Sequence, residues 1–170
     1  KNNYKHGFGS LIDSERNQYI GQFENNMYHG KGTLTGRGGR TKYVGKWCNG
    51  RREGEGEQHY CDGSVYVGEW KSNSRHGRGR LTLPNGHIFK GQWKKEQKNG
   101  HGVENFPLPE GGVLRVEGVW KKGVRDGAFT VTYKKEKVQK DKKKTIEKES
   151  EKEQKNPEAE KEKEKEGEGE

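Results

Sequence analysis

The sequence predicts an all-β fold: an elongated, single-layer, twisted antiparallel sheet of stacked β-hairpin repeats, followed by a charged tail. Three observations predict it. Aromatic residue, glycine and aromatic residue recur at positions i, i+2 and i+4, as in Tyr66, Gly68 and Trp70. Each copy is followed by two closely spaced glycines, as in Gly77 and Gly79. The pattern restarts after about 23 residues, and a fixed period of this kind is typical of stacked repeats.

The repeats divide the chain into a predicted sheet over residues 1–133 and a tail over residues 134–170. The expected units are a partial unit at 1–18, fuller units at 19–42, 43–65, 66–88 and 89–115, and a degraded unit at 116–133. In the degraded unit Val116 stands in place of the first aromatic residue, and Phe129 stands in place of the second glycine. End repeats of such arrays depart from the consensus, so we expect this unit to act as a cap.

Composition alone would suggest a disordered chain, because 24% of the residues are hydrophobic and 36% are charged. Aromatic residues in a fixed register can nevertheless form a thin core. The tail has equal numbers of lysines and acidic residues and no aromatic residue, and we expect it to be disordered or a solvated single helix. The net charge of +9 therefore belongs to residues 1–133.

Each unit is expected to contain two short strands. In a strand alternate side chains share a face, so Tyr66, Gly68 and Trp70 lie on one side of the sheet. A loop of about six residues would lead to the second strand, and Asn85-Gly86 or Asp62-Gly63 would close a type I′ turn into the next unit. Extra residues with two prolines at 106–112 predict a longer loop or an edge bulge.

The glycines within the strands predict that aromatic rings lie flat over bare neighbouring backbone. Helical repeats are the rival interpretation, and the glycine density and the i, i+2, i+4 period disfavour them. We expect the rings mainly to pack the sheet, and partner contact to be secondary. The aromatic face comprises Tyr19, Phe23, Tyr43, Trp47, Tyr66, Trp70, Phe89, Trp93 and Trp120.

The units YIGQF…HGKG, YVGKW…EGEG, YVGEW…HGRG and FKGQW…NGHG resemble MORN (membrane occupation and recognition nexus) repeats over about residues 1–130. The resemblance implies a single-layer sheet of stacked hairpins. Proteins similar to this family are scaffolds of cilia, flagella and division machinery, junctional membrane tethers, or non-catalytic modules attached to lipid kinases and other enzymes.

Basic side chains gather where the first strand of each unit passes into the second. In stacked hairpins these segments line one edge, so the sequence predicts a basic rim suited to phosphoinositide headgroups or to the acidic surface of a polymer such as tubulin. Solvated loops are also often rich in lysine, and this alternative stays open. Nucleic acid is a less favoured partner, because the aromatic residues are committed to the sheet. The rim comprises Arg51, Arg52, Lys71, Arg75, Lys94, Lys95, Lys98, Lys121, Lys122 and Arg125.

We expect no catalytic, cofactor or metal site. His6, His29 and His76 share one repeat position, and successive hairpins place such residues roughly 10 Å apart, too far to share a metal ion. His59, His87 and His101 have no evident role. Cys48 and Cys61 are expected to be reduced, in a cytosolic compartment.

The sequence therefore predicts a non-enzymatic scaffold that binds protein partners in a cytoskeletal or ciliary assembly. One alternative is a phosphoinositide-binding membrane adaptor that uses the basic rim. Another is the docking module of a larger enzyme whose catalytic part lies outside this chain. The expected localisation is cytoplasmic, on the cytoskeleton, in the cilium or at a membrane surface. Edge strands would also permit homo-oligomers.

Overall fold

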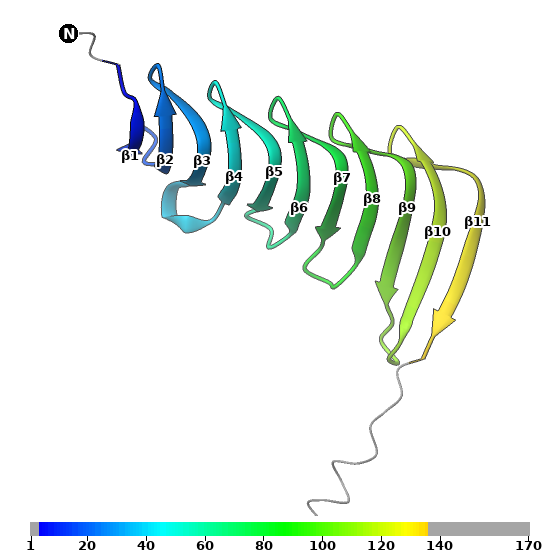
Figure 1. Cartoon of the computed structure of the whole chain (residues 1–170). Coiled ribbons are helices and arrows are strands. Elements are labelled where there is room, and N and C mark those ends of the chain that lie inside the picture. Colours follow the sequence, from blue (N-terminus) through cyan, green and yellow to red (C-terminus); the bar gives the residue numbers. More distant parts are fainter. Residues whose placement is uncertain (1–3, 136–170) are drawn as a thin grey trace, which may run out of the picture. The chain divides into compact units, whose positions relative to one another are not determined.

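The computed structural model describes residues 4–135, and the predicted tail lies largely outside the described residues. These residues form one antiparallel sheet of eleven strands, and each strand pairs with its neighbours in sequence order (Figure 1). The sheet is open, with β1 and β11 at its two edges. The predicted fold class is confirmed.

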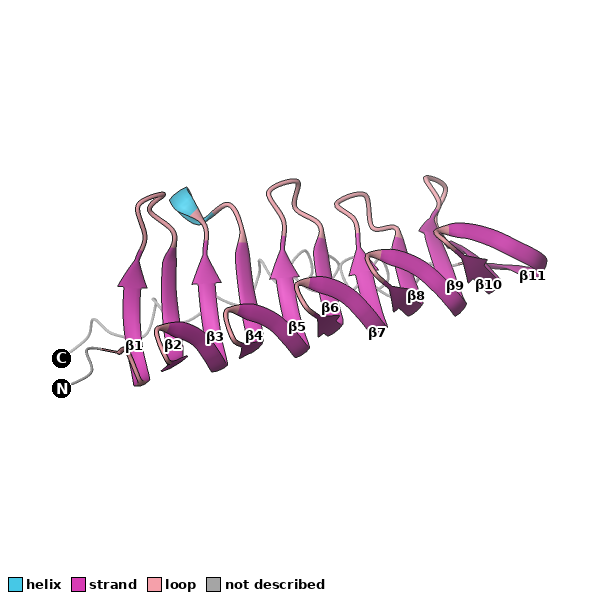
Figure 2. Ribbon diagram, turned by 90° about the horizontal axis from the view of Figure 1, so that it is seen from above, coloured by secondary structure: helices cyan, strands magenta, loops and turns pink. Residues whose placement is uncertain are grey.

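The strands are short at the first edge and longest at the last. Their bounds are β1 Gly7–Ile12, β2 Gln18–Glu24, β3 Met27–Thr35, β4 Lys42–Cys48, β5 Arg51–His59, β6 Val65–Lys71, β7 Ser74–Thr82, β8 Ile88–Lys94, β9 Gln97–Pro107, β10 Val113–Lys121 and β11 Val124–Lys134. One short 3₁₀ turn, Arg37–Gly39, lies in the connection from β3 to β4. The connections form two rows at opposite ends of the strands (Figure 2).

The six-residue loop expected inside each unit is wrong. Two-residue turns connect these strands instead, as at Ser72-Asn73 between β6 and β7. Both turn residues have positive φ, 47° and 69°, which is the type I′ geometry. Since the second strand begins directly after the turn, the glycine pair lies in the middle of that strand. We call these five turns the hairpin tips: Asn25-Asn26, Asn49-Gly50, Ser72-Asn73, Lys95-Glu96 and Lys122-Gly123.

The type I′ turns predicted between units are wrong as well. Leu83 to His87 forms a five-residue loop in which the Gly86 amide donates to the Leu83 carbonyl at 2.9 Å. Gly86 has a φ of 80°, whereas Asn85 is not among the residues with positive φ. Asn85 instead accepts a hydrogen bond from the His87 amide through its side chain. Asparagine therefore serves the turn as a side-chain acceptor, and only the glycine needs the left-handed conformation.

The extra residues at 106–112 lengthen the strands rather than the loop. Phe106 and Pro107 continue β9, where they pair with Leu114 and Val113 of β10. Leu108 to Gly112 then repeats the five-residue loop, with the Gly111 amide donating to the Leu108 carbonyl at 3.0 Å. The predicted longer loop is therefore wrong.

Each central hairpin bends at its glycines. The pairing of β6 with β7 shifts register between Gly68 and Trp70, which leaves extra residues on β7. Gly77 lies in this bulge with a φ of +56°, and the Glu69 carboxylate occupies the space where its side chain would be. A bulge of this kind bends and twists the strands. Its recurrence in four successive hairpins, from β2–β3 to β8–β9, curves the sheet.

The aromatic rings form a continuous row on one face. Tyr66 meets Trp70 of its own strand edge-on, with ring centroids 5.2 Å apart, and meets Trp93 of the next repeat at 5.4 Å. The Trp70 indole N–H donates to the Gly56 carbonyl of the preceding repeat at 3.3 Å. Since Trp47 and Trp93 make the equivalent bond, ring contacts and hydrogen bonds together join successive repeats.

In the last unit an aromatic ring also covers a strand glycine, but the ring comes from the opposite strand. Val116 is too short to cover the glycine two residues later. Phe129, on the opposite strand, lies over Gly118 instead, and a Cβ on that glycine would be 2.4 Å from the Phe129 ring. Its ring meets Trp120 edge-on at 5.7 Å. The two departures from the repeat pattern therefore compensate each other.

Candidate binding surfaces

The aromatic face is filled by its own side chains. All nine predicted ring residues are buried, with exposed fractions from 0% to 6%. Tyr28 stacks on Tyr19 with centroids 3.7 Å apart, and Arg52 covers Trp70 with its guanidinium carbon 4.3 Å from the ring centroid. This burial gives the rings a packing role and leaves little of them for a partner.

The predicted basic rim divides into two groups. Four of its members, one in each of β5, β7, β9 and β11, lie over aromatic rings: Arg52, Arg75, Lys98 and Arg125. The pKa of the Arg52 guanidinium lies below its ordinary value, because burial lowers it more than the nearby phenolic and acidic groups raise it. The other six are exposed within the hairpin tips or directly beside them: Arg51, Lys71, Lys94, Lys95, Lys121 and Lys122.

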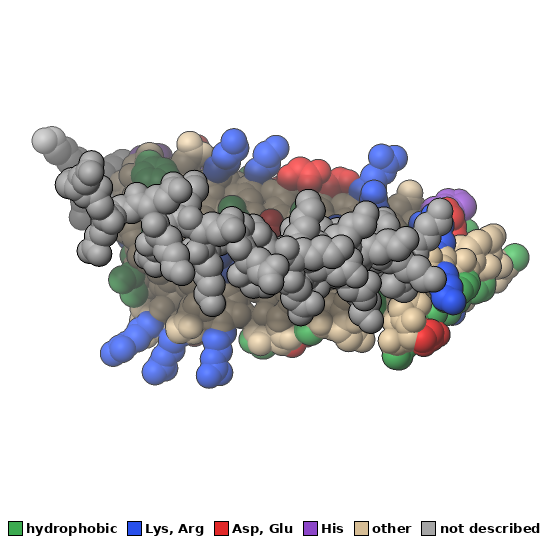
Figure 3. All heavy atoms as spheres, turned by 90° about the horizontal axis from the view of Figure 1, so that it is seen from below, with side chains coloured by type: hydrophobic (Ala, Val, Ile, Leu, Met, Phe, Trp, Pro, Cys, Tyr) green, Lys and Arg blue, Asp and Glu red, His purple; other side chains and the backbone are tan. Residues whose placement is uncertain are grey.

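The tips lie in a row along one end of the strands (Figure 1). Each of the last four tips contacts the hairpin before it. The Asn73 amide donates to the Arg52 carbonyl at 3.1 Å, and the Asn73 side chain accepts from the Arg52 amide at 2.8 Å. Glu96 makes the same two contacts with Arg75. The exposed tip cations are thus held on an ordered series of turns, and Figure 3 shows lysine and arginine side chains projecting from two opposite sides of the view.

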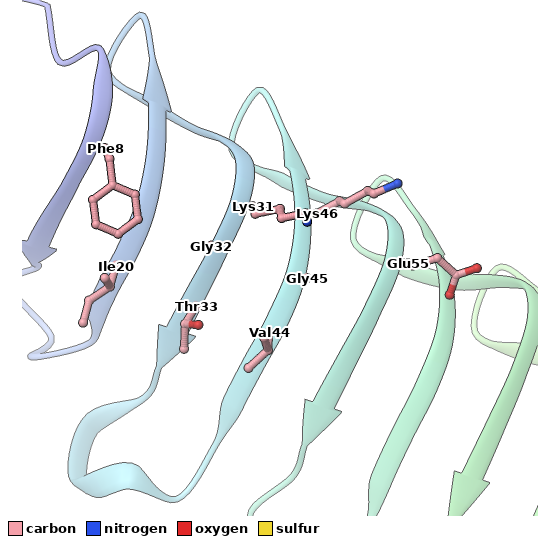
Figure 4. A pocket seen from close by; sticks show the side chains of 9 residues that line it. All are labelled: Phe8, Ile20, Lys31, Gly32, Thr33, Val44, Gly45, Lys46 and Glu55. Carbon is pink, nitrogen blue, oxygen red and sulfur yellow. The ribbon is translucent and has the colours of Figure 1, made fainter.

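The opposite side of the sheet, which we call the outer face, carries the residues that alternate with the rings. This face has exposed apolar side chains at Ile20, Val44 and Val67, whose exposed fractions are 42%, 41% and 47%. Phe8 is 77% exposed and lies beside Ile20 at the first edge (Figure 4). Two hollows lie on this face, and Glu55 lines both. Strand alternation places this set opposite the rings, and the sequence pattern predicts nothing further about it.

A polar cluster near the last edge was missed by the sequence analysis. Glu104 is 5% exposed and lies between Lys98 and Arg125, with the Arg125 guanidinium 2.8 Å from its carboxylate. Burial alone would raise the pKa of Glu104, but its two cationic partners lower it below the usual value.

His87 stacks on Phe106 with centroids 4.2 Å apart, and burial lowers the pKa of its imidazole. His87 therefore has a packing role that its position in the repeat did not indicate.

The buried phenols are held in the neutral form. Tyr43 donates from its hydroxyl to the Lys46 carbonyl at 3.1 Å, and Tyr19 donates to the Gln22 carbonyl at 2.9 Å. Burial raises the pKa of each to about 12. Each hydroxyl bonds to the main chain near the bend, so these groups support the fold.

The described residues bring together no set of three or more potential metal ligands from His, Cys, Asp and Glu. Cys48 and Cys61 are both free and exposed. No helix among residues 4–135 is long and apolar enough to cross a membrane.

Comparison with protein families gives one match. The model of the MORN repeat matches residues 19–39, 43–65, 66–88, 89–107 and 117–128, more than half of the chain. Its segments begin at or within one residue of the predicted units, including the degraded last unit. A search of curated proteins found no match.

Proposed function

Because the chain belongs to the MORN-repeat family, whose members generally bind proteins or membranes, we propose that it is a non-enzymatic scaffold that binds protein partners through the outer face. A single observation carries this proposal. The ring face is covered by the chain's own side chains, whereas the outer face keeps Ile20, Val44 and Val67 exposed. These side chains lie two strands apart from one another, with Thr33 and Glu57 between them, so the face offers a partner apolar and polar contacts in alternation.

The proposed setting is a cytoskeletal or ciliary assembly in the cytoplasm, as expected from the family resemblance. A scaffold of this kind needs a rigid frame that presents side chains at a fixed spacing. The ring row and the tip contacts supply that rigidity, since each repeat is bonded to the one before it.

Proximity labelling in cells tests the proposal, with the full chain and two variants. Val44→Asp with Val67→Asp puts charges on the outer face at two exposed positions and should remove most labelled partners. Lys121→Glu with Lys122→Glu changes the tips and should keep them. Labelled proteins that are the same for the outer-face variant and the wild type would contradict the proposal.

A membrane adaptor is the second candidate, and the row of tip cations favours it. Each basic residue near an anionic bilayer contributes about 1 kcal/mol, so Lys94, Lys95, Lys121 and Lys122 could together hold the tips at a membrane. Four of the ten predicted rim residues lie over rings, which reduces the charge available for this contact.

Flotation with phosphoinositide vesicles at low and raised salt separates the two candidates. Binding that is lost when the four tip lysines are changed to glutamate would support the membrane function. Changing Arg51 together with Lys71 to glutamate provides a second tip variant, because both side chains are also exposed.

A further inference from the structure

The outer face carries like charges directly opposite each other on neighbouring strands. Lys31 of β3 faces Lys46 of β4, and Glu55 of β5 faces Glu69 of β6. Arg80 of β7 faces Lys90 of β8. Directly opposed side chains in an antiparallel sheet have Cβ atoms about 5 Å apart, and like charges at this distance destabilise the sheet.

Little within the described residues neutralises these groups. No ion pair within residues 4–135 involves Lys31, Lys46, Arg80 or Lys90. Glu69 accepts a hydrogen bond from the Arg78 amide at 2.7 Å, so Glu55 carries the free carboxylate of its pair. The face therefore presents three charge groups in the order positive, negative, positive.

The three groups are evenly spaced across the strands, and the third is offset along them. Each pair lies two strands from the next, so the groups follow one another at roughly 10 Å across the strands. The lysine pair and the Glu55–Glu69 pair lie on the tip side of the central glycines, whereas the Arg80–Lys90 pair lies on their other side, two residues further along the strands. One hollow is lined by Lys31 and Lys46, the other by Arg80 and Lys90, and Glu55 lines both. Figure 4 shows the first of these hollows, with Val44 beside Thr33 and the two lysines nearer the tips.

We propose that the outer face docks an amphipathic helix of a partner protein that carries acidic, basic and acidic residues at seven-residue spacing. Seven residues of an α-helix rise about 10.5 Å, and positions i, i+7 and i+14 lie on one side of it. Because the Arg80–Lys90 pair is offset by two residues along the strands, the helix would cross the strands obliquely. Its two acidic residues would then meet the lysine pair and the Arg80–Lys90 pair, and its basic residue would meet Glu55. Apolar residues between them would cover Val44 and Val67.

This inference rests on the proposed function and makes it specific. It explains a sheet that keeps opposed like charges, because a docked helix would supply the countercharges that the sheet itself lacks. A surface that served only solubility could carry positive and negative side chains on alternate strands. It would stay soluble and would avoid the repulsion between opposed like charges.

Synthetic helical peptides test the inference with the full chain. One probe carries Glu, Lys and Glu at i, i+7 and i+14, and its inverse carries Lys, Glu and Lys on the same host sequence. We expect the first probe to bind at least about tenfold more tightly in fluorescence anisotropy, because like-charge contacts penalise the wrong partner. Equal binding of the two probes, tighter binding of the inverse probe, or no binding of either would overturn the inference.

A single substitution separates docking from a structural role. Lys46→Glu places a carboxylate opposite Lys31, so we expect it to raise the melting temperature and to weaken the first probe about tenfold. Lys71→Glu makes the same change of charge at a tip and should leave the preference between probes unchanged. A Lys46→Glu protein that is more stable and binds the first probe as well as the wild type would contradict the docking site.

The two proposals can fail separately. If neither probe binds but Val44→Asp with Val67→Asp still removes labelled partners in cells, the helix is wrong and the protein-binding face stands. If anionic vesicles bind and are released by Lys46→Glu, the face takes lipid headgroups and the inference is wrong.

Discussion

The hydroxyl oxygen of Tyr66 occupies the space that a side chain on Gly79 would need. A Cβ at Gly79 would lie 2.2 Å from that oxygen, and one at Gly68 would lie 2.5 Å from the Gly79 Cα. The ring lies flat over a pair of opposed glycines because neither has a side chain. Tyr66 is thereby fully buried in a sheet that has only one layer.

Gly79→Ala should therefore destabilise the sheet strongly. The added methyl group must displace the Tyr66 ring, and overpacking of this kind costs about 1–3 kcal/mol or more. Gly9→Ala is the matched control, because Gly9 holds the same repeat position but a Cβ there would be 3.5 Å from the Phe23 ring, an ordinary contact. Urea unfolding of both variants measures the difference, and equal losses of unfolding free energy would contradict the ring-over-glycine account.

Lys95→Asn should stabilise the hairpin tip between β8 and β9. Lys95 has a φ of 49°, a left-handed conformation that asparagine adopts more readily than lysine. We expect a gain of about 0.5–1 kcal/mol in unfolding free energy, measured by thermal or urea unfolding. Lys94→Asn, one residue earlier at the end of β8, should give no gain. A larger gain at Lys94 would show that the backbone conformation is not the cause.

Arg75→Ala should destabilise the protein more than removal of an exposed tip cation. The Arg75 guanidinium carbon lies 4.4 Å from the Trp93 ring centroid, and its Nε lies 2.7 Å from the Glu96 carboxylate. Loss of the cation–π contact and of the packing over the ring should cost about 1–2 kcal/mol. Lys71→Ala should change the unfolding free energy by less than about 0.5 kcal/mol. The same loss in both variants would mean that Arg75 acts only through net charge.

Alkaline pH should unfold the sheet through its buried phenols. Burial raises the pKa of Tyr43 to about 12, above its ordinary value of 10.0. Between these values the unfolded chain releases the proton while the folded chain keeps it, so stability is complete below pH 10 and falls as pH rises toward 12. Urea unfolding at about pH 9 and about pH 11 should show this decrease.

Tyr43→Phe should weaken that dependence on pH, since it removes the ionisable hydroxyl. Phenylalanine fits the position, because Phe89 holds it in a later repeat with 2% exposure. A variant with the same decrease in stability between the two pH values as the wild type would rule out Tyr43 as a contributor.

The fold could be predicted because it depends on short-range pattern. Tyr66, Gly68 and Trp70 share a face by strand alternation alone, and the 23-residue period carries this result to the other repeats. The positions of the turns could not be predicted in the same way. Asn85-Gly86 looks like a type I′ turn, but a tip can use Ser72-Asn73 because contacts with the preceding hairpin hold it.

The surfaces were harder to predict, because burial depends on which strands become neighbours. Arg52 belongs to the basic rim by position, yet its side chain lies over Trp70 from the next repeat. The pairing of Glu55 with Glu69 follows from the register of β5 and β6, which is continuous between two hairpins that each contain a bulge. A register of this kind could be recovered from the sequence only once the glycine pairs were placed in the middle of the second strands.

Trp47, Trp70 and Trp93 each donate to a glycine carbonyl of the repeat before, and the N–O distances at these three successive junctions are 3.2 to 3.3 Å. Such junctions are interchangeable: excision of residues 66–88 would bring Trp93 against Gly56 as Trp70 is now. The array can thus grow or shrink by whole repeats, which makes the reach of the protein a property that evolution can adjust without redesigning any contact.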